Sequence, residues 1–425
     1  MLQYEYMRIY FSGIGGVGLG PLAEIARDAG YEVLGSDAKP SRTTDELRTN
    51  GIAVDFDQSG DYLSAEHDNQ PIHWFVYTSA LPDDHPELVR AQTLGIRCGK
   101  RDELLNHIIQ QKNLKLIAVA GTHGKTTTTA MAVWLFQQLG IAVSYSIGSG
   151  IGFGPSGKFD PLSQYFVYEC DEFDRNFLHF NPFVSLVTSI DFDHPDTYPT
   201  QAEYTRAFSQ FIAQSTHAIM WDRDTVINVQ TTPETWRLHE GEMMEFQIAG
   251  AHNRQNATLV AKACEYLQIG DTATIKAAIE SFPGTDRRFE KLSEGLYSDY
   301  GHHPVEISAT LQMARELSEH VVLVYQPHQN TRQHQVRSGY TSCMELAEEI
   351  YWLPTYQSRE DLNLPLLEPQ ALTARLTNRN HVTYSQMDDE LWSRIQYARQ
   401  QGKLVLCMGA GSIDTWVREQ LAKTL

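Results

Sequence analysis

Two glycine-rich segments of the chain each follow an apolar stretch and precede a helical pattern, an arrangement that binds phosphate groups. The first, Gly13–Gly18, reads Gly-Ile-Gly-Gly-Val-Gly. Glycine allows the backbone to approach a diphosphate held by amides at the start of the following helix. Asp37 ends the next apolar stretch, where a carboxylate can accept a hydrogen bond from a ribose. The segment predicts a nucleotide-diphosphate site without naming the nucleotide, and a purely structural turn is the alternative.

The second segment has the features of a P-loop. Leu116–Ala120 is apolar, and the residues from Gly121 to Thr127 read Gly-Thr-His-Gly-Lys-Thr-Thr. In such a loop the amides surround the phosphates, the lysine neutralises their charge, and a hydroxyl such as that of Thr126 can reach Mg²⁺. The spacing departs from the standard motif because Val119 stands where the first glycine is expected. We predict that this loop binds ATP phosphates.

Acidic residues and a histidine follow two apolar stretches beyond the P-loop. They are Glu169, Asp171, Glu172 and Asp174 after the first stretch, and Asp191, Asp193, His194 and Asp196 after the second. A solvated charged surface would also produce such a cluster. Carboxylates and an imidazole at neighbouring strand ends nevertheless suit divalent cations that bridge ATP and substrate. We therefore predict that Thr126, Glu169 and His194 bind Mg²⁺ or Mn²⁺.

Later segments combine amide, imidazole and guanidinium groups. They span residues 251–257, 287–289, 299–304 and 326–332. Each has an ordinary explanation when taken alone: Asn253 and Asn256 could cap a helix, and His302 and His303 could be surface residues of a loop. Arg332 follows a further predicted strand, where its guanidinium could bind an anion.

Strands and helices must alternate along the chain to position these groups. Apolar, β-rich stretches recur at residues 8–12, 31–35, 74–78, 116–120, 165–169, 184–189, 217–221, 321–325, 349–353 and 404–408. Helical patterns follow at 22–28, 128–139, 257–267, 304–317 and 388–399. The alternation predicts an α/β fold with mostly parallel sheets, whose ligands bind beyond the carboxyl ends of the strands. Polar seams divide the chain into three predicted domains, 1–112, 113–283 and 284–425.

Composition narrows the class of protein. The formal net charge of −19 over 425 residues argues against a nonspecific nucleic-acid or membrane-surface binder. No apolar stretch approaches the roughly 20 residues of a membrane span, and five scattered cysteines suggest neither disulfides nor a zinc site. We expect a cytoplasmic enzyme, with no nucleic-acid partner and no membrane insertion, that is a monomer or a weak homodimer.

The order of these motifs resembles the Mur ligase superfamily almost end to end, and within it the alanine-adding branch. The resemblance rests on Gly13–Gly18, Gly121–Thr129, 169–178, 193–198, 252–256, 287–289, 299–304 and 327–332. It implies an N-terminal Rossmann-like domain for a UDP-sugar, a central P-loop ATPase domain and a C-terminal Rossmann-like domain. The implied reaction joins L-alanine to the carboxylate of UDP-N-acetylmuramate through an acyl phosphate, with ATP and Mg²⁺.

The resemblance also implies roles for individual residues. The UDP-sugar would be bound by Gly13, Ile14, Gly15, Gly16, Val17, Gly18, Asp37 and Ser79. ATP would be bound by Gly121, Thr122, His123, Gly124, Lys125, Thr126, Thr127, Asn256, Arg288 and Asp299. The amino acid would meet His302, Gln329 and Arg332. The catalytic residues would be Lys125, His194, Arg288 and His302.

Two departures from the family pattern concern the C-terminal region. Gln329 replaces one of two expected arginines, and Ser412 replaces an expected aspartate. The first leaves open which small amino acid is used. Three other functions are considered: a peptidoglycan-recycling ligase that joins a tripeptide to the same UDP-sugar, an NAD-dependent dehydrogenase using Gly13–Gly18, and an inactive nucleotide-binding regulator. The P-loop disfavours the dehydrogenase, and retention of Lys125, Glu169 and His194 disfavours the regulator.

Overall fold

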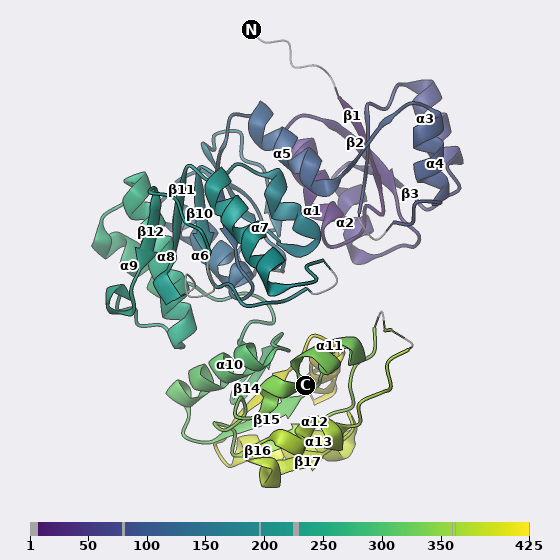
Figure 1. The fold of residues 1–425 in the computed structure, drawn as a ribbon. Coiled ribbons are helices and arrows are strands. Elements are labelled where there is room, and N and C mark those ends of the chain that lie inside the picture. The colour runs from purple at the N-terminus through teal and green to yellow at the C-terminus, as the bar shows by residue number, and fades with distance from the viewer. Residues whose placement is uncertain are drawn as a thin grey trace. The chain divides into compact units, whose positions relative to one another are not determined.

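The structure is a computed structural model that describes residues 7–78, 81–194, 197–223, 229–358, 360–361 and 363–424. Its helices and strands form a mixed α/β fold with three mostly parallel sheets (Figure 1), which confirms the predicted fold class. The chain divides into two compact units. The first unit comprises Met1–Met243 and Leu259–Phe282, and the second comprises Met244–Thr258 and Pro283–Leu425.

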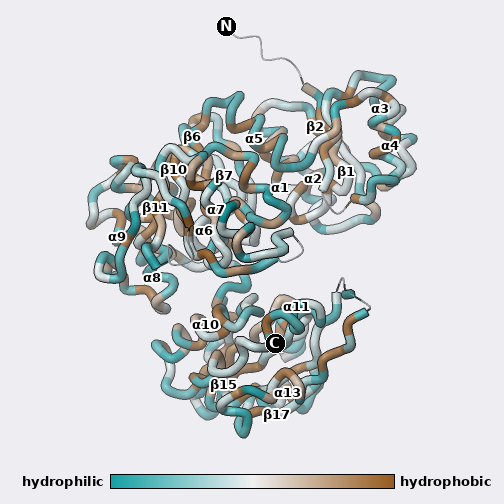
Figure 2. The backbone as a smooth tube through the Cα atoms, in the orientation of Figure 1, coloured by the Kyte–Doolittle hydropathy of each residue, from teal (hydrophilic) through white to brown (hydrophobic). Residues whose placement is uncertain are grey.

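The N-terminal sheet has five parallel strands in the order β3-β2-β1-β4-β5. They are β1 (Arg8–Ser12), β2 (Glu32–Ser36), β3 (Ala53–Asp55), β4 (Trp74–Tyr77) and β5 (Arg97–Lys100). The helices are α1 (Leu19–Asp28), α2 (Arg42–Thr49), α3 (Asp61–Asn69), α4 (Pro86–Thr93) and α5 (Arg101–Gln111). Every residue of β1 is buried, because this strand lies in the middle of the sheet. Helix α3, hydrophilic in Figure 2, has Leu63 as its buried residue.

The central sheet has the order β12-β11-β10-β6-β9-β7-β8, and only the β7–β8 pair is antiparallel among the pairings described. Its strands are β6 (Lys115–Ala120), β7 (Ser144–Ser146), β8 (Gly157–Lys158), β9 (Tyr165–Glu169), β10 (Val184–Val187), β11 (His217–Trp221) and β12 (Thr235–Leu238). The helices of this region are α6 (Lys125–Gln138), α7 (Gln201–Gln214), α8 (Ala251–Leu267) and α9 (Thr272–Glu280), with the 3₁₀ segment η1 (Phe173–His179). Strand β6, which leads into the P-loop, lies between β10 and β9, so the loop leaves the interior of the sheet.

The C-terminal sheet has the order β13-β14-β18-β15-β16-β17, antiparallel between β13 and β14 and parallel elsewhere. Its strands are β13 (Glu290–Ser293), β14 (Leu296–Asp299), β15 (Val321–Tyr325), β16 (Glu349–Trp352), β17 (Val382–Tyr384) and β18 (Leu404–Met408). The helices are α10 (Pro304–Leu317), α11 (Asn330–Val336), α12 (Pro369–Leu372), α13 (Asp389–Gln400) and α14 (Ile413–Thr424). Buried apolar residues cover both faces of this sheet in separate clusters, as a parallel sheet requires.

The predicted strands are present within one or two residues of their expected bounds, and α10 spans the range expected for it. Helix α8 differs: it begins at Ala251 rather than Ala257, so Asn253 and Asn256 lie inside the helix. The alternative that they cap a helix N-terminus is therefore wrong. Short strands such as β3 and β5 were not predicted, because three or four residues are too few to show a clear apolar run or alternation.

The sequence predicted neither a membrane span nor a disulfide framework. No helix in the described residues combines the length and the hydropathy needed to cross a membrane. All five cysteines are free thiols, and four of them are buried.

Candidate functional site

The P-loop connects β6 to α6 through a turn that needs glycine at two positions. Gly121 has φ +135°, and a Cβ added there would lie 2.3 Å from Thr188 Oγ1. Gly124 has φ +84° and is the N-cap residue of α6. Side chains strongly disfavour such backbone conformations. The loop is fixed to β10 because Thr122 N donates to Ser189 O at 2.9 Å and His123 N to Ser189 Oγ at 3.0 Å.

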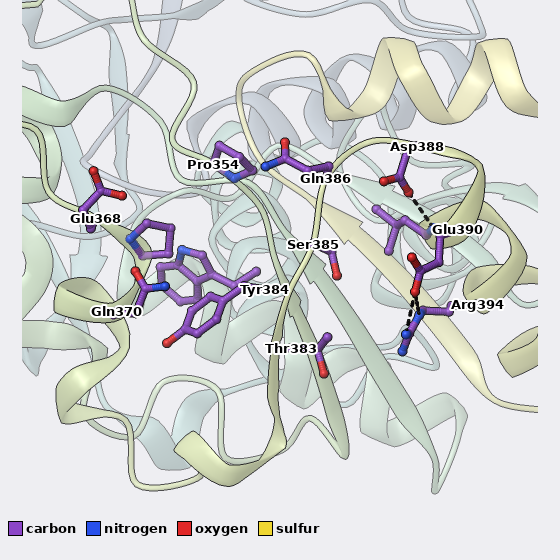
Figure 3. A pocket seen from close by; sticks show the side chains of 13 residues that line it. Pro354, Glu368, Gln370, Thr383, Tyr384, Ser385, Gln386, Asp388, Glu390 and Arg394 are labelled. Atoms are coloured by element: carbon purple, nitrogen blue, oxygen red, sulfur yellow. Dashed lines mark hydrogen bonds and ion pairs between the residues drawn. The ribbon is translucent and has the colours of Figure 1, made fainter.

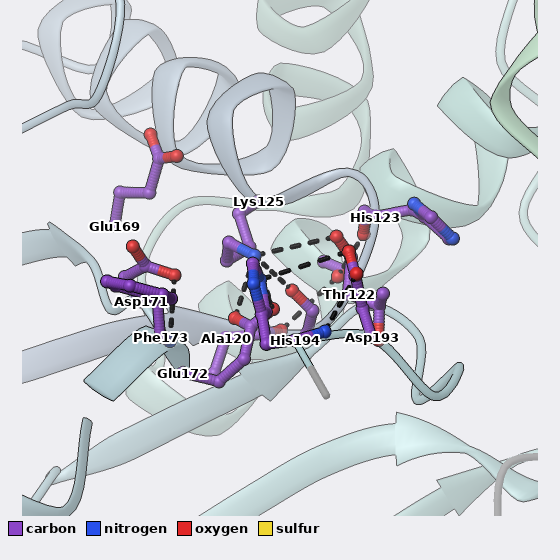
Figure 4. A network of polar contacts seen from close by, with 12 residues as sticks. Ala120, Thr122, His123, Lys125, Glu169, Asp171, Glu172, Phe173, Asp193 and His194 are labelled. Carbon is purple, nitrogen blue, oxygen red and sulfur yellow. Dashed lines mark hydrogen bonds and ion pairs between the residues drawn. The ribbon is translucent and has the colours of Figure 1, made fainter. Parts of the chain in front are cut away.

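Lys125 forms an ion pair with a glutamate that was not among the predicted site residues. Its Nζ donates to both Glu172 carboxylate oxygens, at 2.7 and 3.1 Å, and to Gly121 O at 2.6 Å (Figure 4). The Glu172 side chain is completely buried. Burial alone would raise the pKa of Glu172, but Lys125 and His194 outweigh it and hold the pKa below its usual range. The P-loop ammonium is thus neutralised from within the protein.

The same glutamate contacts His194. His194 Nε2 lies 3.5 Å from Glu172 Oε1 and 3.9 Å from Asp193 Oδ2. Burial alone would lower the pKa of His194, but the hydrogen bond with Glu172 and the charge of Asp193 outweigh it and raise the pKa. The Tyr204 hydroxyl lies 3.5 Å from Glu172 Oε1 and 2.8 Å from Thr122 Oγ1. Glu172 is therefore the centre of a network that joins the P-loop to His194.

The predicted metal ligands Thr126, Glu169 and His194 fall into two separate groups of residues. Thr126 Oγ1 donates to Glu169 Oε1 at 2.8 Å, and Gly148 N donates to Glu169 Oε2 at 2.7 Å. His194 instead belongs to a group with Asp171 and Glu172 whose ligand atoms lie within 4.8 Å of one another. The carboxylate oxygens of Asp171 and Glu172 suit Mg²⁺ or Mn²⁺, whereas an imidazole nitrogen is a ligand more typical of transition metals. The residues beside the P-loop are thus chemically suited to the predicted cation.

The glycine loop between β1 and α1 offers backbone donors rather than a charge. Gly13 and Ile14 donate to Ser36 O at 2.9 Å, and Gly15 N donates to Asp37 Oδ2 at 2.8 Å. Asp37, predicted to bind a ribose, thus holds the loop against the end of β2. Ile14 is buried, whereas Val17 is 93% exposed. Gly16 N donates to Gly13 O at 3.0 Å, which closes the turn. Ser79 and Asp196 lie outside the described residues.

A cavity of about 230 Å³ in the first unit extends from the glycine loop to Glu169. Its lining includes Val17, Gly18, Arg101, Asp102, Ser146, Gly148, Tyr168, Glu169 and Asp171. Glu169 also contacts P-loop Thr126. The cavity lining thus includes both the glycine loop and a carboxylate that contacts the P-loop.

In the second unit, Asp299 is held by two backbone amides. Phe289 N donates to its Oδ2 at 2.8 Å, and Gly301 N donates to its Oδ1 at 2.7 Å. Burial raises the pKa of Asp299 to about 6, although nearby Arg288 and the amides act in the opposite direction. The guanidinium of Arg288 stacks on the Tyr300 ring at 5.1 Å from its centroid. The structure thus brings together Arg288 and Asp299, both predicted to bind ATP.

His302, His328 and Arg332 also come together in the second unit. The rings of His302 and His328 are 5.8 Å apart. Burial lowers the pKa of His302, and burial, His302 and Arg332 lower the pKa of His328 to about 4. Gln329 points elsewhere: its Nε2 donates to Ser358 O at 2.9 Å. The sequence did not single out His328 as a site residue, although it lies in the same segment as Arg332.

Three further positions complete the predicted set. Asn256 is buried on the part of α8 that belongs to the second unit. Ser412, at an expected aspartate, accepts a hydrogen bond from Gln326 Nε2 at 3.2 Å immediately before α14. Thr127 lies in the first turn of α6.

The second unit contains a cavity that includes none of the predicted site residues. Its volume is about 460 Å³, and it lies beyond the carboxyl ends of β16 and β17 (Figure 3). Pro354, Glu368, Tyr384 and Gln386 line it. Glu390 and Arg394 on α13 form an ion pair at its edge, at 2.7 Å.

The fold and the loop geometry define the class of the protein as an α/β protein with three mostly parallel sheets. Its P-loop follows a strand of the sheet that comes second along the chain. Comparison with known families gives three matches along the chain. The Mur ligase family catalytic domain matches residues 8–113, the Mur ligase middle domain 119–236, and the Mur ligase glutamate ligase domain 287–411.

Individual relatives cover nearly the whole chain. UDP-N-acetylmuramate–L-alanine ligase from Thermosynechococcus vestitus is 30% identical over 99% of this chain and 97% of the relative. The ligase of the same name from Porphyromonas gingivalis is 30% identical over 96% of this chain and 97% of the relative. The solved UDP-N-acetylmuramate–alanine ligase from Thermotoga maritima has a TM-score of 0.74 at 23% identity and covers 99% of each chain. The chain belongs to the Mur ligase family and is an ATP-dependent ligase that forms a carbon–nitrogen bond.

Proposed function

We propose that this enzyme joins L-alanine to the lactyl carboxylate of UDP-N-acetylmuramate in the cytoplasmic synthesis of peptidoglycan precursors. Relatives with that printed activity align over nearly the full chain. The observation that carries the proposal is the cavity that leads from Val17 and Gly18 to Glu169, because Glu169 also contacts P-loop Thr126. One end of this cavity suits the diphosphate of a UDP-sugar, and the other suits the carboxylate to be activated.

The first step transfers the γ-phosphoryl group of ATP to that carboxylate. A carboxylate oxygen attacks phosphorus, ADP leaves, and an acyl phosphate forms. Amides at the start of α6 hold the phosphates, and the Lys125 ammonium neutralises charge that develops during transfer. For this to happen, Lys125 exchanges part of its contact with Glu172 for the phosphates. Glu172 retains its contact with His194 and keeps that imidazole oriented.

In the second step the amine of the amino acid attacks the acyl carbon, and phosphate leaves with one oxygen of the original carboxylate. His302 and Arg332 address the amino acid, and Asp299 and Arg288 address the ATP ribose and phosphates. Burial holds the pKa of His302 below its usual range, so its imidazole is neutral near pH 7 and can accept the proton that the amine nitrogen loses as it bonds to the acyl carbon. Gln329 supports the loop through Ser358 O rather than binding the carboxylate.

A bound Mg²⁺ or Mn²⁺ would neutralise phosphate charge. The candidate ligands are Asp171, Glu172 and His194 in one group and Thr126 and Glu169 in another. Asp171, Glu172 and His194 already lie close enough to share one cation. The contact between Thr126 and Glu169 places a hydroxyl and a carboxylate beside the same loop.

Phosphate release with UDP-N-acetylmuramate tests the proposal across L-alanine, glycine, L-serine and an L-alanyl tripeptide of the peptidoglycan type. We expect release only when ATP, the UDP-sugar and an amino acid are all present, with L-alanine giving the highest kcat/KM and mass spectrometry showing the amide product. Preference for the tripeptide would instead assign the enzyme to recycling. Release that does not require the UDP-sugar would contradict the proposal.

A further inference from the structure

Arg101 supplies a positive charge to a cavity that is otherwise acidic. Among the described residues lining the 230 Å³ cavity, Arg101 is the sole cation, and Asp102, Glu169 and Asp171 are carboxylates. A UDP-sugar would bring at least two further negative charges into this space. Backbone amides relieve part of that repulsion, but a guanidinium binds phosphate oxygens through two parallel hydrogen bonds and neutralises charge as well.

The guanidinium lies directly against the glycine loop. A Cβ added to Gly18 would be 2.6 Å from Arg101 Nη1, so glycine is the residue that leaves room for Arg101 here. Arg101 is the first residue of α5, and Gly18 is the N-cap residue of α1. In the part of the chain that the structure describes, the amides of Val17 and Gly18 donate to no backbone acceptor. Two amides and a guanidinium therefore meet at the same end of the cavity.

The ion pair of Arg101 within the protein is longer than that of Arg254. The one ion pair of Arg101 among the described residues is with Asp102, at 3.5 Å between Nε and Oδ1. Asp102 is buried and also accepts a hydrogen bond from the Tyr168 hydroxyl at 3.0 Å. Arg254, by contrast, contacts both oxygens of Glu316 at 2.9 Å. The Arg101 side chain is one third exposed and also lies near the charge of Asp171. A guanidinium has five donors, so one long ion pair leaves donors that an anion in the cavity can use.

We propose that Arg101 binds the diphosphate of the UDP-linked substrate together with the amides of Val17 and Gly18. The inference rests on the proposed function for the identity of the sugar, and it adds to that function a binding residue from outside both glycine-rich loops. The diphosphate is favoured over the lactyl carboxylate because Arg101 Nη1 lies against Gly18 of the glycine loop, whereas Glu169 contacts Thr126 of the P-loop.

Calorimetric binding of UDP and of UDP-N-acetylmuramate to the full-length protein tests this assignment. The variants are Arg101→Met, which removes the charge, and Arg101→Lys, which keeps the charge but loses the planar fork. Lys100→Met is the matched control, because Lys100 is the neighbouring cation and its Nζ is paired with Asp174 at 2.6 Å. The affinity for a non-hydrolysable ATP analogue and the unfolding midpoint establish that each variant is folded.

We expect Arg101→Met to weaken binding of both UDP and UDP-N-acetylmuramate by about tenfold to a hundredfold. Arg101→Lys should show a smaller loss for both ligands, and it serves alone if Arg101→Met does not fold. Lys100→Met should remain within about twofold of wild type.

Three results would decide against the assignment. Unchanged UDP affinity in both Arg101 variants would overturn it. Weaker binding of UDP-N-acetylmuramate with unchanged binding of UDP would move Arg101 to the carboxylate end. A wild-type protein that binds neither ligand would also overturn it. Failure of the proposed function would give a different result. If UDP binding depends on Arg101 but the wild type forms no amide, the role of Arg101 stands and the proposed reaction is wrong.

Discussion

The P-loop and the glycine loop are built on the same plan but satisfy their charges differently. Each connects the carboxyl end of a buried strand, β6 or β1, to the start of a helix. The P-loop carries its own cation, Lys125, which is neutralised by the buried Glu172. The glycine loop carries no charged side chain, and Asp37 accepts a hydrogen bond from one of its backbone amides.

The difference shows how one acidic protein can bind two anionic nucleotides. At the P-loop, a buried ion pair is ready to exchange one partner for a phosphate, so binding replaces a contact that already exists. At the glycine loop, the donors are amides, and Val17 is left exposed. We therefore expect loss of the carboxylate partner to have a large effect at the P-loop, where it is Glu172, and a small effect at the glycine loop, where it is Asp37 and where the cation, Arg101, comes from α5 instead of the loop.

The largest expected effect is on phosphoryl transfer. Lys125→Ala should lower kcat/KM by a factor that corresponds to about 4 kcal/mol, the upper range for loss of one preorganised electrostatic donor. Binding of UDP should stay within about twofold of wild type, because the glycine loop is intact. Steady-state kinetics and calorimetry on the same preparation check both parts. Turnover within tenfold of wild type would remove Lys125 from the reaction.

The next effect concerns stability. Glu172→Gln should lower the free energy of unfolding by about 3 kcal/mol, because it leaves the enclosed Lys125 ammonium without its counter-charge. Asp37→Asn is the matched substitution at the glycine loop. It should cost less than about 1 kcal/mol, since the amide oxygen can still accept from Gly15 N. Denaturant unfolding measures both, and equal losses would erase the distinction between the loops.

The pH dependence of stability follows from the same ion pair. Lys125 and His194 outweigh burial and lower the pKa of Glu172 to about 2, below the ordinary value of about 4.3. A lowered acid pKa contributes stability that is present above the unfolded value and is lost as pH falls through the folded value. Wild type should therefore lose about 1–2 kcal/mol more than Glu172→Gln between pH 5 and pH 3. Parallel pH profiles for the two proteins would refute this origin.

The smallest effect tests shape at the glycine loop. A Cβ added to Gly15 would lie 2.7 Å from Thr44 Cγ2 and 2.9 Å from Asp37 Oδ2. Gly15→Ala should therefore displace the loop and weaken UDP binding about tenfold, or about 1.4 kcal/mol. Affinity for an ATP analogue should not change. A variant that binds UDP as tightly as wild type would show that the loop tolerates the displacement.

Both loops could be predicted from the sequence because their function depends on local spacing. A strand, a run of glycines and a helix start lie within about ten residues, and the structure retains that order at Gly13–Gly18 and Gly121–Thr127. The three-sheet α/β fold followed from the same alternation of apolar stretches and helical patterns.

Glu172 and Arg101 could not be identified in this way, because their importance comes from tertiary packing. Glu172 is one of four acidic residues in a short segment, and positive φ angles at Asp174 and Arg175 break the regular periodicity there. Which carboxylate is buried depends on Lys125 and on Tyr204 from α7. Arg101 is distant in sequence from Gly18, and only the packing of α5 beside α1 brings them together.

The central claim is that the ligands of the two loops meet in one reaction through an acyl phosphate. UDP-N-acetylmuramate labelled with ¹⁸O in its lactyl carboxylate tests this directly, with ATP and L-alanine as the other substrates. Because phosphate leaves with one carboxylate oxygen, mass spectrometry should find one ¹⁸O atom in each phosphate released and one in the amide product. Phosphate that carries no label, released at the rate of amide formation, would contradict the account.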